Sequence, residues 1–186
     1  MFIPTRRLLL RPSWPEDLEE FVALINDERV ANTLVSIPLP ECADAAREYI
    51  ATARDPLLPH FFIYLRDSQG LKLVGSTGFE RVSGSDDVEL GYWIAGGHQG
   101  CGYASEAVVA VLAHAWMLGH RRVLSIPFAD NEVALRLLEH AGFVDTGERK
   151  ARVNYRTMRE QEALVFEATH PGTTAQAQVS GARETA

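Results

Sequence analysis

The sequence predicts a single domain of the α/β (α+β) class, with a mixed, mostly antiparallel central sheet and helices on both faces. Stretches with helical spacing alternate with strand-like stretches in the order strand, two helices, a run of strands, helix, strand, helix, strands. The run of strands is divided by sequences typical of tight turns. The 186 residues, 46% of them hydrophobic and 23% charged, suit one globular domain of ordinary size.

The first part of the chain is expected to supply one strand and two helices. Residues 6–11 have the character of a strand. Residues 14–26 carry apolar side chains at three- and four-residue steps, which predicts a helix with one buried face. Pro38 and Pro40 then interrupt the chain before a second helical stretch at residues 43–53.

An antiparallel meander is expected next. Three strand-like segments cover residues 60–66, 71–82 and 88–95. They are separated by Ser68-Gln69-Gly70 and Ser83-Gly84-Ser85-Asp86, both of which have turn chemistry.

A glycine-rich loop at residues 96–102 opens the second half and leads into a long helix that ends near Gly119. The elements expected after it are a strand at 122–127, a helix that Asp130 or Asn131 can cap and that runs to Gly142, and strands near 143–149 and 163–168. Because a helical crossover joins the strand from residue 88 to the strand from residue 122, these two strands should be parallel. Ligands tend to bind at the carboxyl ends of such strands.

The last residues have a different composition. From Pro171 onward Gly, Thr, Ala, Gln and Ser dominate, with few apolar anchors, so residues 171–186 are predicted to be a disordered tail. Residues 1–170 remain as the folded domain.

Composition excludes several classes of function. The formal net charge of -7 argues against a broad nucleic-acid-binding surface. Cys42 and Cys101 have no paired spacing, which argues against a disulfide framework or a zinc site and suits a reducing compartment. No signal peptide is evident, and no apolar stretch approaches the ~20 residues that a membrane span needs. The cytoplasm is therefore the expected location.

The glycine-rich loop is the most informative segment, because a strand ends there, glycines allow the backbone to turn, and a helix begins. Unpaired N–H groups and a partial positive charge at a helix start are suited to a pyrophosphate. A plain strand-to-helix turn would use glycine equally well. The loop lacks the Gly-Lys-Ser/Thr of a P-loop and the third glycine of a dinucleotide fingerprint.

The segment Gln99-Gly100-Cys101-Gly102-Tyr103-Ala104 matches the Gln/Arg-x-x-Gly-x-Gly/Ala signature of the GCN5-related N-acetyltransferase (GNAT) superfamily. The surrounding sequence resembles its RimJ/RimL-like branch, and the resemblance covers about residues 5 to 168 in family order. Four further segments carry it: Thr5-Arg6-Arg7-Leu8-Leu9-Leu10-Arg11-Pro12, Val74-Gly75-Ser76-Thr77-Gly78-Phe79, Glu89-Leu90-Gly91-Tyr92-Trp93-Ile94, and Asn131-Glu132-Val133-Ala134-Leu135-Arg136-Leu137-Leu138-Glu139-His140-Ala141-Gly142-Phe143.

The resemblance implies an acetyl-CoA-dependent N-acetyltransferase that acts on a primary amine, either a protein N-terminus or a small molecule, by direct attack of the amine on the thioester. Acetyl-CoA would be the co-substrate, with its pyrophosphate on main-chain N–H groups of Gln99, Gly100, Cys101, Gly102, Tyr103 and Ala104. Ile94 and Ala95 would pair with the pantetheine arm. Asn131 would hydrogen-bond the cofactor, although helix capping explains an asparagine there equally well. A homodimer would be unsurprising.

Glu89 is the candidate base that removes the proton of the amine, because it lies in the strand leading to the loop and the family often has a glutamate there. An exposed strand glutamate, or an ion-pair partner for Arg81, is an equally good interpretation. Glu106, in the first turn of the long helix, is expected to have a structural role.

Two positions depart from the family pattern, because Ala134 and Leu138 stand where a serine and a tyrosine often serve the departing thiolate. This departure keeps open a second hypothesis, a non-catalytic acyl-CoA-binding sensor or scaffold.

Overall fold

The computed structural model describes residues 1–26, 43–52, 54–82, 84–85, 87–155 and 157–172. The expectations for Pro38, Pro40 and Cys42, and for the tail from residue 173 onward, lie outside these residues.

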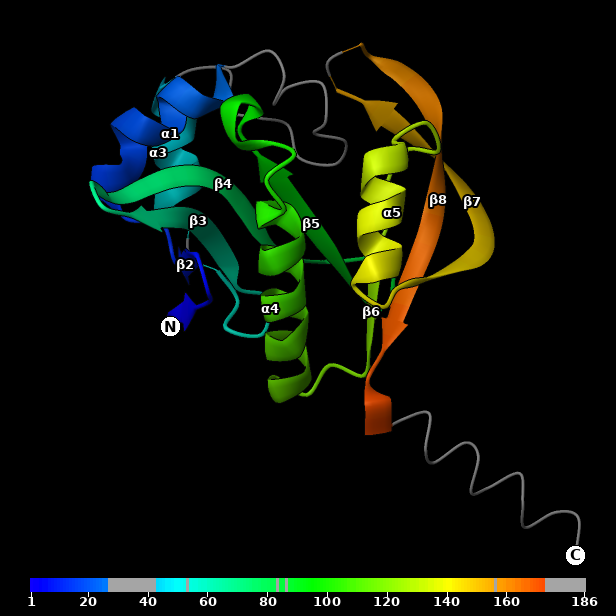
Figure 1. Cartoon of the computed structure of the whole chain (residues 1–186). Coiled ribbons are helices and arrows are strands. Elements are labelled where there is room, and N and C mark those ends of the chain that lie inside the picture. Colours follow the sequence, from blue (N-terminus) through cyan, green and yellow to red (C-terminus); the bar gives the residue numbers. More distant parts are fainter. Residues whose placement is uncertain (27–42, 53, 83, 86, 156, 173–186) are drawn as a thin grey trace, which may run out of the picture.

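One sheet of eight strands runs through the molecule in the spatial order β1-β2-β3-β4-β5-β6-β8-β7 (Figure 1). β5 and β6 are parallel, as the crossover predicted, and the other neighbouring pairs are antiparallel. The strands are β1 (Ile3–Pro4), β2 (Leu8–Arg11), β3 (His60–Asp67), β4 (Gly70–Arg81), β5 (Val88–Ile94), β6 (Arg122–Ser125), β7 (Val144–Asn154) and β8 (Arg159–Thr169).

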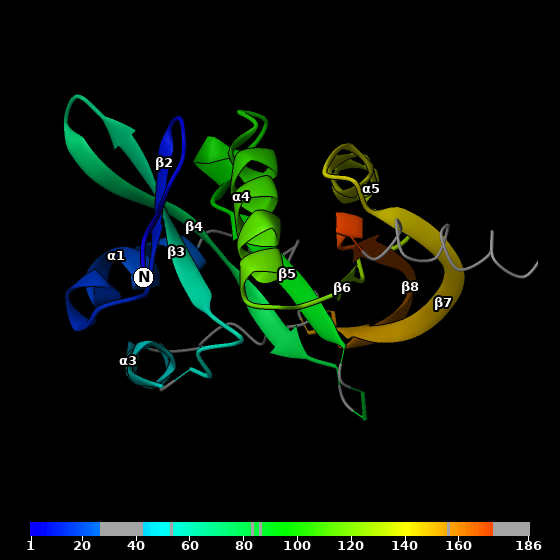
Figure 2. The same ribbon diagram turned by 90° about the horizontal axis from the view of Figure 1, so that it is seen from below.

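Helices cover both faces of this sheet, as the sequence predicted (Figure 2). On one face lie α1 (Leu18–Ile25), entered through a short 3-10 turn at Pro15–Asp17, and α3 (Ala43–Ala51). On the other lie α4 (Tyr103–Met117) and α5 (Glu132–His140). None of the helices in the described residues is long and apolar enough to span a membrane.

Strand alternation sorts the core into two layers. Phe61 and Ile63 of β3 pack in the cluster that α4 and α5 cover. Phe62 and Tyr64, the residues between and after them, pack in the cluster that α1 and α3 cover. The sheet is therefore buried on both faces at β3, which explains the nearly continuous apolar run in this strand.

Two glycines of β4 are required by close contacts rather than by a turn. A Cβ at Gly75 would lie 2.2 Å from the carbonyl oxygen of Trp93, and a Cβ at Gly78 would lie 2.7 Å from the ring of His60. The motif Val74-Gly75-Ser76-Thr77-Gly78-Phe79 therefore lets β4 fit tightly between its neighbours.

The structure corrects the sequence prediction at the sheet edges. β1 was not predicted, because it is only two residues long and pairs only with β2. β7 and β8 extend to Asn154 and from Arg159, well beyond the predicted segments at 143–149 and 163–168. The extension consists mainly of polar residues, so it has no hydrophobic alternation to reveal it. The long cross-strand register of the β7–β8 hairpin defines it instead.

Candidate active site

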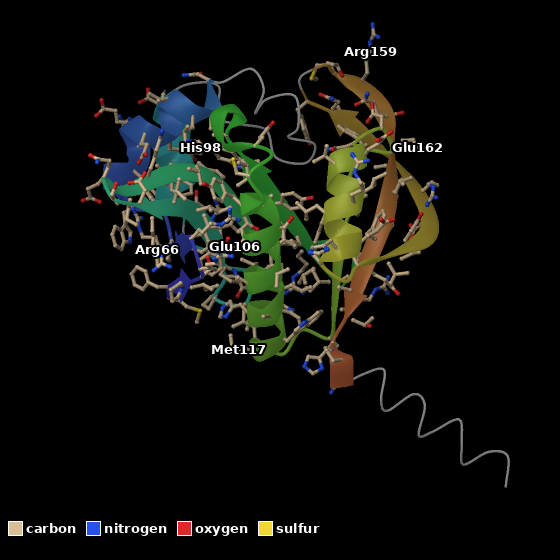
Figure 3. The ribbon with its side chains drawn as sticks, in the orientation of Figure 1. Arg66, His98, Glu106, Met117, Arg159 and Glu162 are labelled. Carbon is tan, nitrogen blue, oxygen red and sulfur yellow. The ribbon has the colours of Figure 1, made fainter. Side chains whose placement is uncertain are left out.

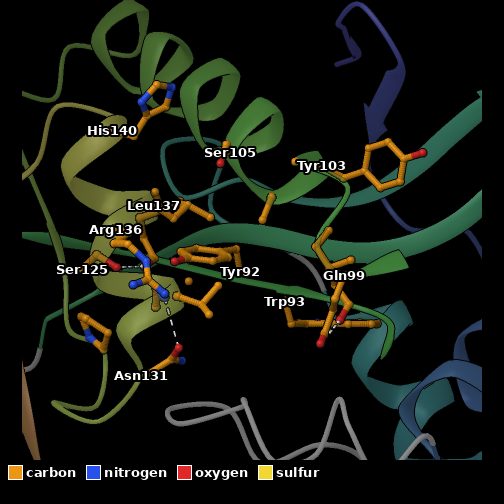
Figure 4. Close-up of a pocket in the computed structure, with 18 of the residues that line it drawn as sticks. Tyr92, Trp93, Gln99, Tyr103, Ser105, Ser125, Asn131, Arg136, Leu137 and His140 are labelled. Atoms are coloured by element: carbon orange, nitrogen blue, oxygen red, sulfur yellow. Dashed lines mark hydrogen bonds between the residues drawn. The ribbon is translucent and has the colours of Figure 1, made fainter. Parts of the chain in front are cut away.

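The site begins where the sheet splits. The ladder between β5 and β6 contains only the pairs Val88↔Val123 and Glu89↔Leu124, although β5 continues to Ile94. Beyond Glu89 the two strands separate, and a cavity of about 650 Å³ opens in this region, at their carboxyl ends (Figure 4). Its walls come from four regions: residues 89–94 of β5, residues 98–100 and 102–105, residues 125–127 at the end of β6, and Asn131, Val133, Ala134, Arg136, Leu137 and His140 at α5.

The glycine-rich loop forms one end of this cavity and adopts the predicted strand-to-helix geometry. Gly100 and Gly102 have φ values of 74° and 76°, in the left-handed region that glycine adopts readily. Gly102 is the N-cap of α4, and its carbonyl accepts the first helical hydrogen bond, from the N–H of Glu106 at 3.2 Å. The N–H groups of Tyr103, Ala104 and Ser105, which lie between Gly102 and Glu106, are at the helix start, where an anion is favoured. The side chain of Gln99 donates to the carbonyl of Ile94 at 2.9 Å and ties the loop to the strand.

The structure brings most of the predicted cofactor residues together. Seven of them line the cavity: Ile94, Gln99, Gly100, Gly102, Tyr103, Ala104 and Asn131. Ala95 and Cys101 are not among the lining residues.

Ala95 is tied to the sheet, because its N–H donates to the carbonyl of Val74 at 2.8 Å. By the alternation of an antiparallel ladder, the main-chain groups of Leu90, Tyr92 and Ile94 point the other way, toward the side where β6 has separated. Ser125 confirms this direction for Leu90, because its hydroxyl donates to the Leu90 carbonyl at 3.1 Å.

Asn131 fulfils the capping role that the sequence suggested. It is the N-cap of α5, and its side-chain oxygen accepts from the N–H of Ala134 at 3.1 Å. It also lines the cavity, so helix capping and ligand contact are compatible.

Glu89 lines the cavity where the ladder between β5 and β6 ends, and it is held by a partner that the sequence did not suggest. Arg152 of β7 donates from Nη1 and Nη2 to its two carboxylate oxygens, at 2.6 and 2.8 Å. The Glu89 side chain is only 13% exposed and the Arg152 side chain only 24%. Arg152 was missed because 63 residues separate it from Glu89, and no local pattern relates side chains that only the fold brings together.

A second carboxylate, that of Glu80, accompanies Glu89. Glu80 is its direct cross-strand partner, and both line a small hollow that also contains His60. Desolvation, and then the negative charge of Glu89, raise the pKa of the Glu80 carboxyl group. The structure therefore places two acidic side chains of different environment beside the split in the sheet.

Ala134 and Leu138, the two positions that depart from the family pattern, have no side-chain group that could give a proton to the departing thiolate. Ala134 lines the cavity, and Leu138 is fully buried in the core. Tyr92 also lines the cavity, and its hydroxyl is buried without a hydrogen-bond partner among the described residues. Burial raises the pKa of Tyr92, so it stays protonated.

Comparison with known proteins agrees with this geometry. Residues 7–144 match the family described as "Acetyltransferase (GNAT) domain". The chain is 28% identical over 152 residues to the uncharacterised N-acetyltransferase YoaA of Bacillus subtilis (strain 168), covering 78% of this chain and 84% of that protein.

Solved structures of other proteins share the fold, including the two that follow. The ribosomal-protein-S5-alanine acetyltransferase of Vibrio fischeri superposes with a TM-score of 0.75 at 13% identity, over 92% of this chain and 97% of the other. The protein yncA of Salmonella typhimurium, solved with its cofactor acetyl-CoA, gives 0.68 at 17% identity, over 87% and 93%. With the loop, the split sheet and the family match in agreement, the chain belongs to the GNAT family of acetyltransferases, enzymes that use acetyl-CoA.

Proposed function

We propose that this protein transfers the acetyl group of acetyl-CoA to a primary amine, by direct attack of the amine on the thioester. The observation that carries the proposal is one continuous cavity that is lined both by the helix-start loop, through Gln99, Gly100, Gly102, Tyr103 and Ala104, and by Glu89. Family membership supports acetyl transfer.

The residues of the cavity suit this chemistry. The amides at the start of α4 bind the diphosphate, and the outward main-chain groups of Ile94 and its neighbours pair with the pantetheine arm. Asn131 hydrogen-bonds the same arm. Bound acetyl-CoA supplies the activated acetyl group. Holding both reactants in line contributes up to ~7–11 kcal/mol in well-oriented cases.

Glu89 is proposed as the group that accepts the proton of the amine. An amine is largely protonated at neutral pH, with a reference pKa of about 8 for an α-amino group and about 10.4 for lysine. A positioned carboxylate contributes roughly 10²–10⁴-fold to such a transfer. Two hydrogen bonds from the Arg152 guanidinium hold the Glu89 carboxylate in one orientation.

The acceptor is proposed to be a protein N-terminus or a small amine, in a RimJ/RimL-like enzyme whose catalytic domain ends near residue 170 and which works in the cytoplasm. The likeness to the Vibrio fischeri ribosomal-protein acetyltransferase motivates the first acceptor class. It is a likeness of fold, and one fold serves many acceptors.

Two measurements test the proposal. CoA is expected to raise the melting temperature of the purified protein, because a ligand that binds only the native state stabilises it. Thiol release with a panel of amines and N-terminal peptides then identifies the acceptor. A melting temperature that does not move at saturating CoA would contradict the proposal.

Glu89→Gln tests the base. We expect a rate at least about 100-fold lower with CoA binding retained. Glu162→Gln, a change of an exposed glutamate in β8, is the matched control and should keep the wild-type rate. Wild-type kinetics in Glu89→Gln would remove Glu89 from this role.

A non-catalytic acyl-CoA sensor is the second candidate. It is favoured by Ala134 and the buried Leu138, which leave those two positions without a group that protonates the thiolate. CoA binding without thiol release for any amine in the panel would favour the sensor.

A further inference from the structure

The N-terminal segment Thr5-Arg6-Arg7, to which the proposed function gives no role, lies against the glycine-rich loop. The Arg7 side chain donates from Nε to Oε2 of Glu106, and its main-chain N–H donates to Oε1, both at 2.7 Å. The hydroxyl of Thr5 donates to the same Oε1 at 2.6 Å. Both carboxylate oxygens of Glu106, which is labelled on α4 in Figure 3, therefore accept hydrogen bonds from residues about 100 positions earlier in the chain.

Neutralisation of Glu106 matters because of its position. A helix start attracts one anion, and a carboxylate in the first turn competes with a diphosphate for the same partial positive charge. Burial by itself would raise the pKa of Glu106, but hydrogen bonds from Thr5 and Arg7 outweigh it and hold the pKa below its usual range. Glu106 is thus an anion whose charge is balanced by Arg7.

The same guanidinium also holds the loop. Nη1 of Arg7 donates to the carbonyl of Cys101 at 2.9 Å, and the guanidinium lies 4.7 Å from the ring centroid of Tyr103. The Tyr103 ring points away from the cavity, toward the N-terminal strand (Figure 4). A Cβ at Gly102 would lie 3.4 Å from Nη2, so the loop backbone and the guanidinium are in close contact.

We propose that Arg7 is a positioning residue for the diphosphate of CoA. It holds the Cys101 carbonyl and the Glu106 carboxylate on one side of the loop. The N–H groups at the start of α4 therefore face the ligand without a competing negative charge. The inference rests on the proposed function, because it takes the loop to be the CoA site.

The primary test is the affinity of Arg7→Gln for CoA, measured by titration calorimetry on the full chain. We expect a dissociation constant about 10- to 100-fold higher than that of the wild type, from the loss of charge-assisted contacts. Turnover of S-acetylpantetheine, which has no diphosphate, should keep its wild-type kcat/KM. A general loss of structure would reduce both, so an equal loss for the two donors would overturn the proposal.

The neutralisation of Glu106 by Arg7 is tested separately by a double variant. In Arg7→Gln the Glu106 carboxylate is left unbalanced beside the ligand, so adding Glu106→Gln should restore CoA affinity about 3- to 10-fold. Glu106→Gln alone, which leaves Arg7 in place, should change affinity less than Arg7→Gln does. A double variant that binds CoA no better than Arg7→Gln would overturn the neutralisation role.

Arg6→Gln is the matched control, because it removes an exposed arginine next to Arg7 in the sequence. It should bind CoA as the wild type does. If Arg7→Gln does not fold, Arg7→Lys takes its place and is expected to weaken CoA about 3- to 10-fold, because one ammonium does not make all the Arg7 contacts.

Unchanged CoA affinity in every Arg7 variant would overturn the inference and leave the proposed function intact. Failure of the wild type to bind CoA would overturn both.

Discussion

Replacing Asp17 with asparagine is expected to destabilise the fold by about 3 kcal/mol, because it leaves a buried guanidinium without its counter-charge. Nη1 and Nη2 of Arg11 donate to the two oxygens of Asp17 at 2.8 and 2.7 Å, and the side chains are only 8% and 7% exposed. Asp17 also accepts the N–H of Trp14 at 2.7 Å.

The lower end of the usual 3–5 kcal/mol range applies because Arg11 keeps other partners. It donates to the carbonyl of Pro12 at 2.9 Å, and its guanidinium lies 3.9 and 4.2 Å from the ring centroids of Trp14 and Tyr64. For a domain of this size each kcal/mol lowers the melting temperature by about 2–4 °C, so a loss of about 6–12 °C is expected by calorimetry or circular dichroism.

The effect should also depend on pH. Burial would raise the pKa of Asp17, but the hydrogen bond and charge of Arg11 outweigh it, so the folded pKa lies below the unfolded one. The stabilisation is therefore present above the unfolded value of about 3.9 and is lost as the pH falls through the folded value. The difference between wild type and Asp17→Asn should narrow in strong acid.

Asp44→Asn provides the control. Its partner is Arg47, three residues along α3, and the side chains are 89% and 62% exposed. Its loss should change stability by less than about 0.5 kcal/mol. If Asp17→Asn proves no more destabilising than Asp44→Asn, the buried pair does not stabilise the fold in the way argued.

Three further predictions concern the fold and the site. Gly75→Ala should cost about 3 kcal/mol or more in urea unfolding, since its Cβ would lie 2.2 Å from the Trp93 carbonyl oxygen, whereas Gly97→Ala, with nothing within 4 Å, should be neutral. Burial lowers the pKa of His60 to about 4, so this histidine stays neutral in the fold and protonates at about 6.5 once unfolded. Stability should therefore fall by about 2 kcal/mol from pH 7 to pH 5, and the fall should be smaller in His60→Gln. Asn131→Ser removes the amide but keeps a hydroxyl that can cap α5, so we expect weaker CoA binding at an unchanged melting temperature. Unchanged CoA affinity would show that Asn131 serves only as a helix cap.

Local sequence patterns anticipated most of the architecture, because their causes are local. Period-two and period-3.6 patterns identified the meander and the helices, and the crossover between residues 88 and 122 predicted that β5 and β6 are parallel. Gly100 and Gly102 of the loop have positive φ, as a strand-to-helix turn of this kind requires. The order of these motifs identified the family as well.

Tertiary structure alone decided how charged groups meet across the site. Glu89 pairs with Arg152, 63 residues away, and Glu106 pairs with Arg7, 99 residues away. Such partners depend on strand register and on how far β5 and β6 diverge, which no local periodicity encodes. Local patterns in the sequence were sufficient to identify most of the elements, the loop and the family. The fold decided which side chains reach the loop and the cavity, because long-range ion pairs form only after the strands and helices that carry them have packed.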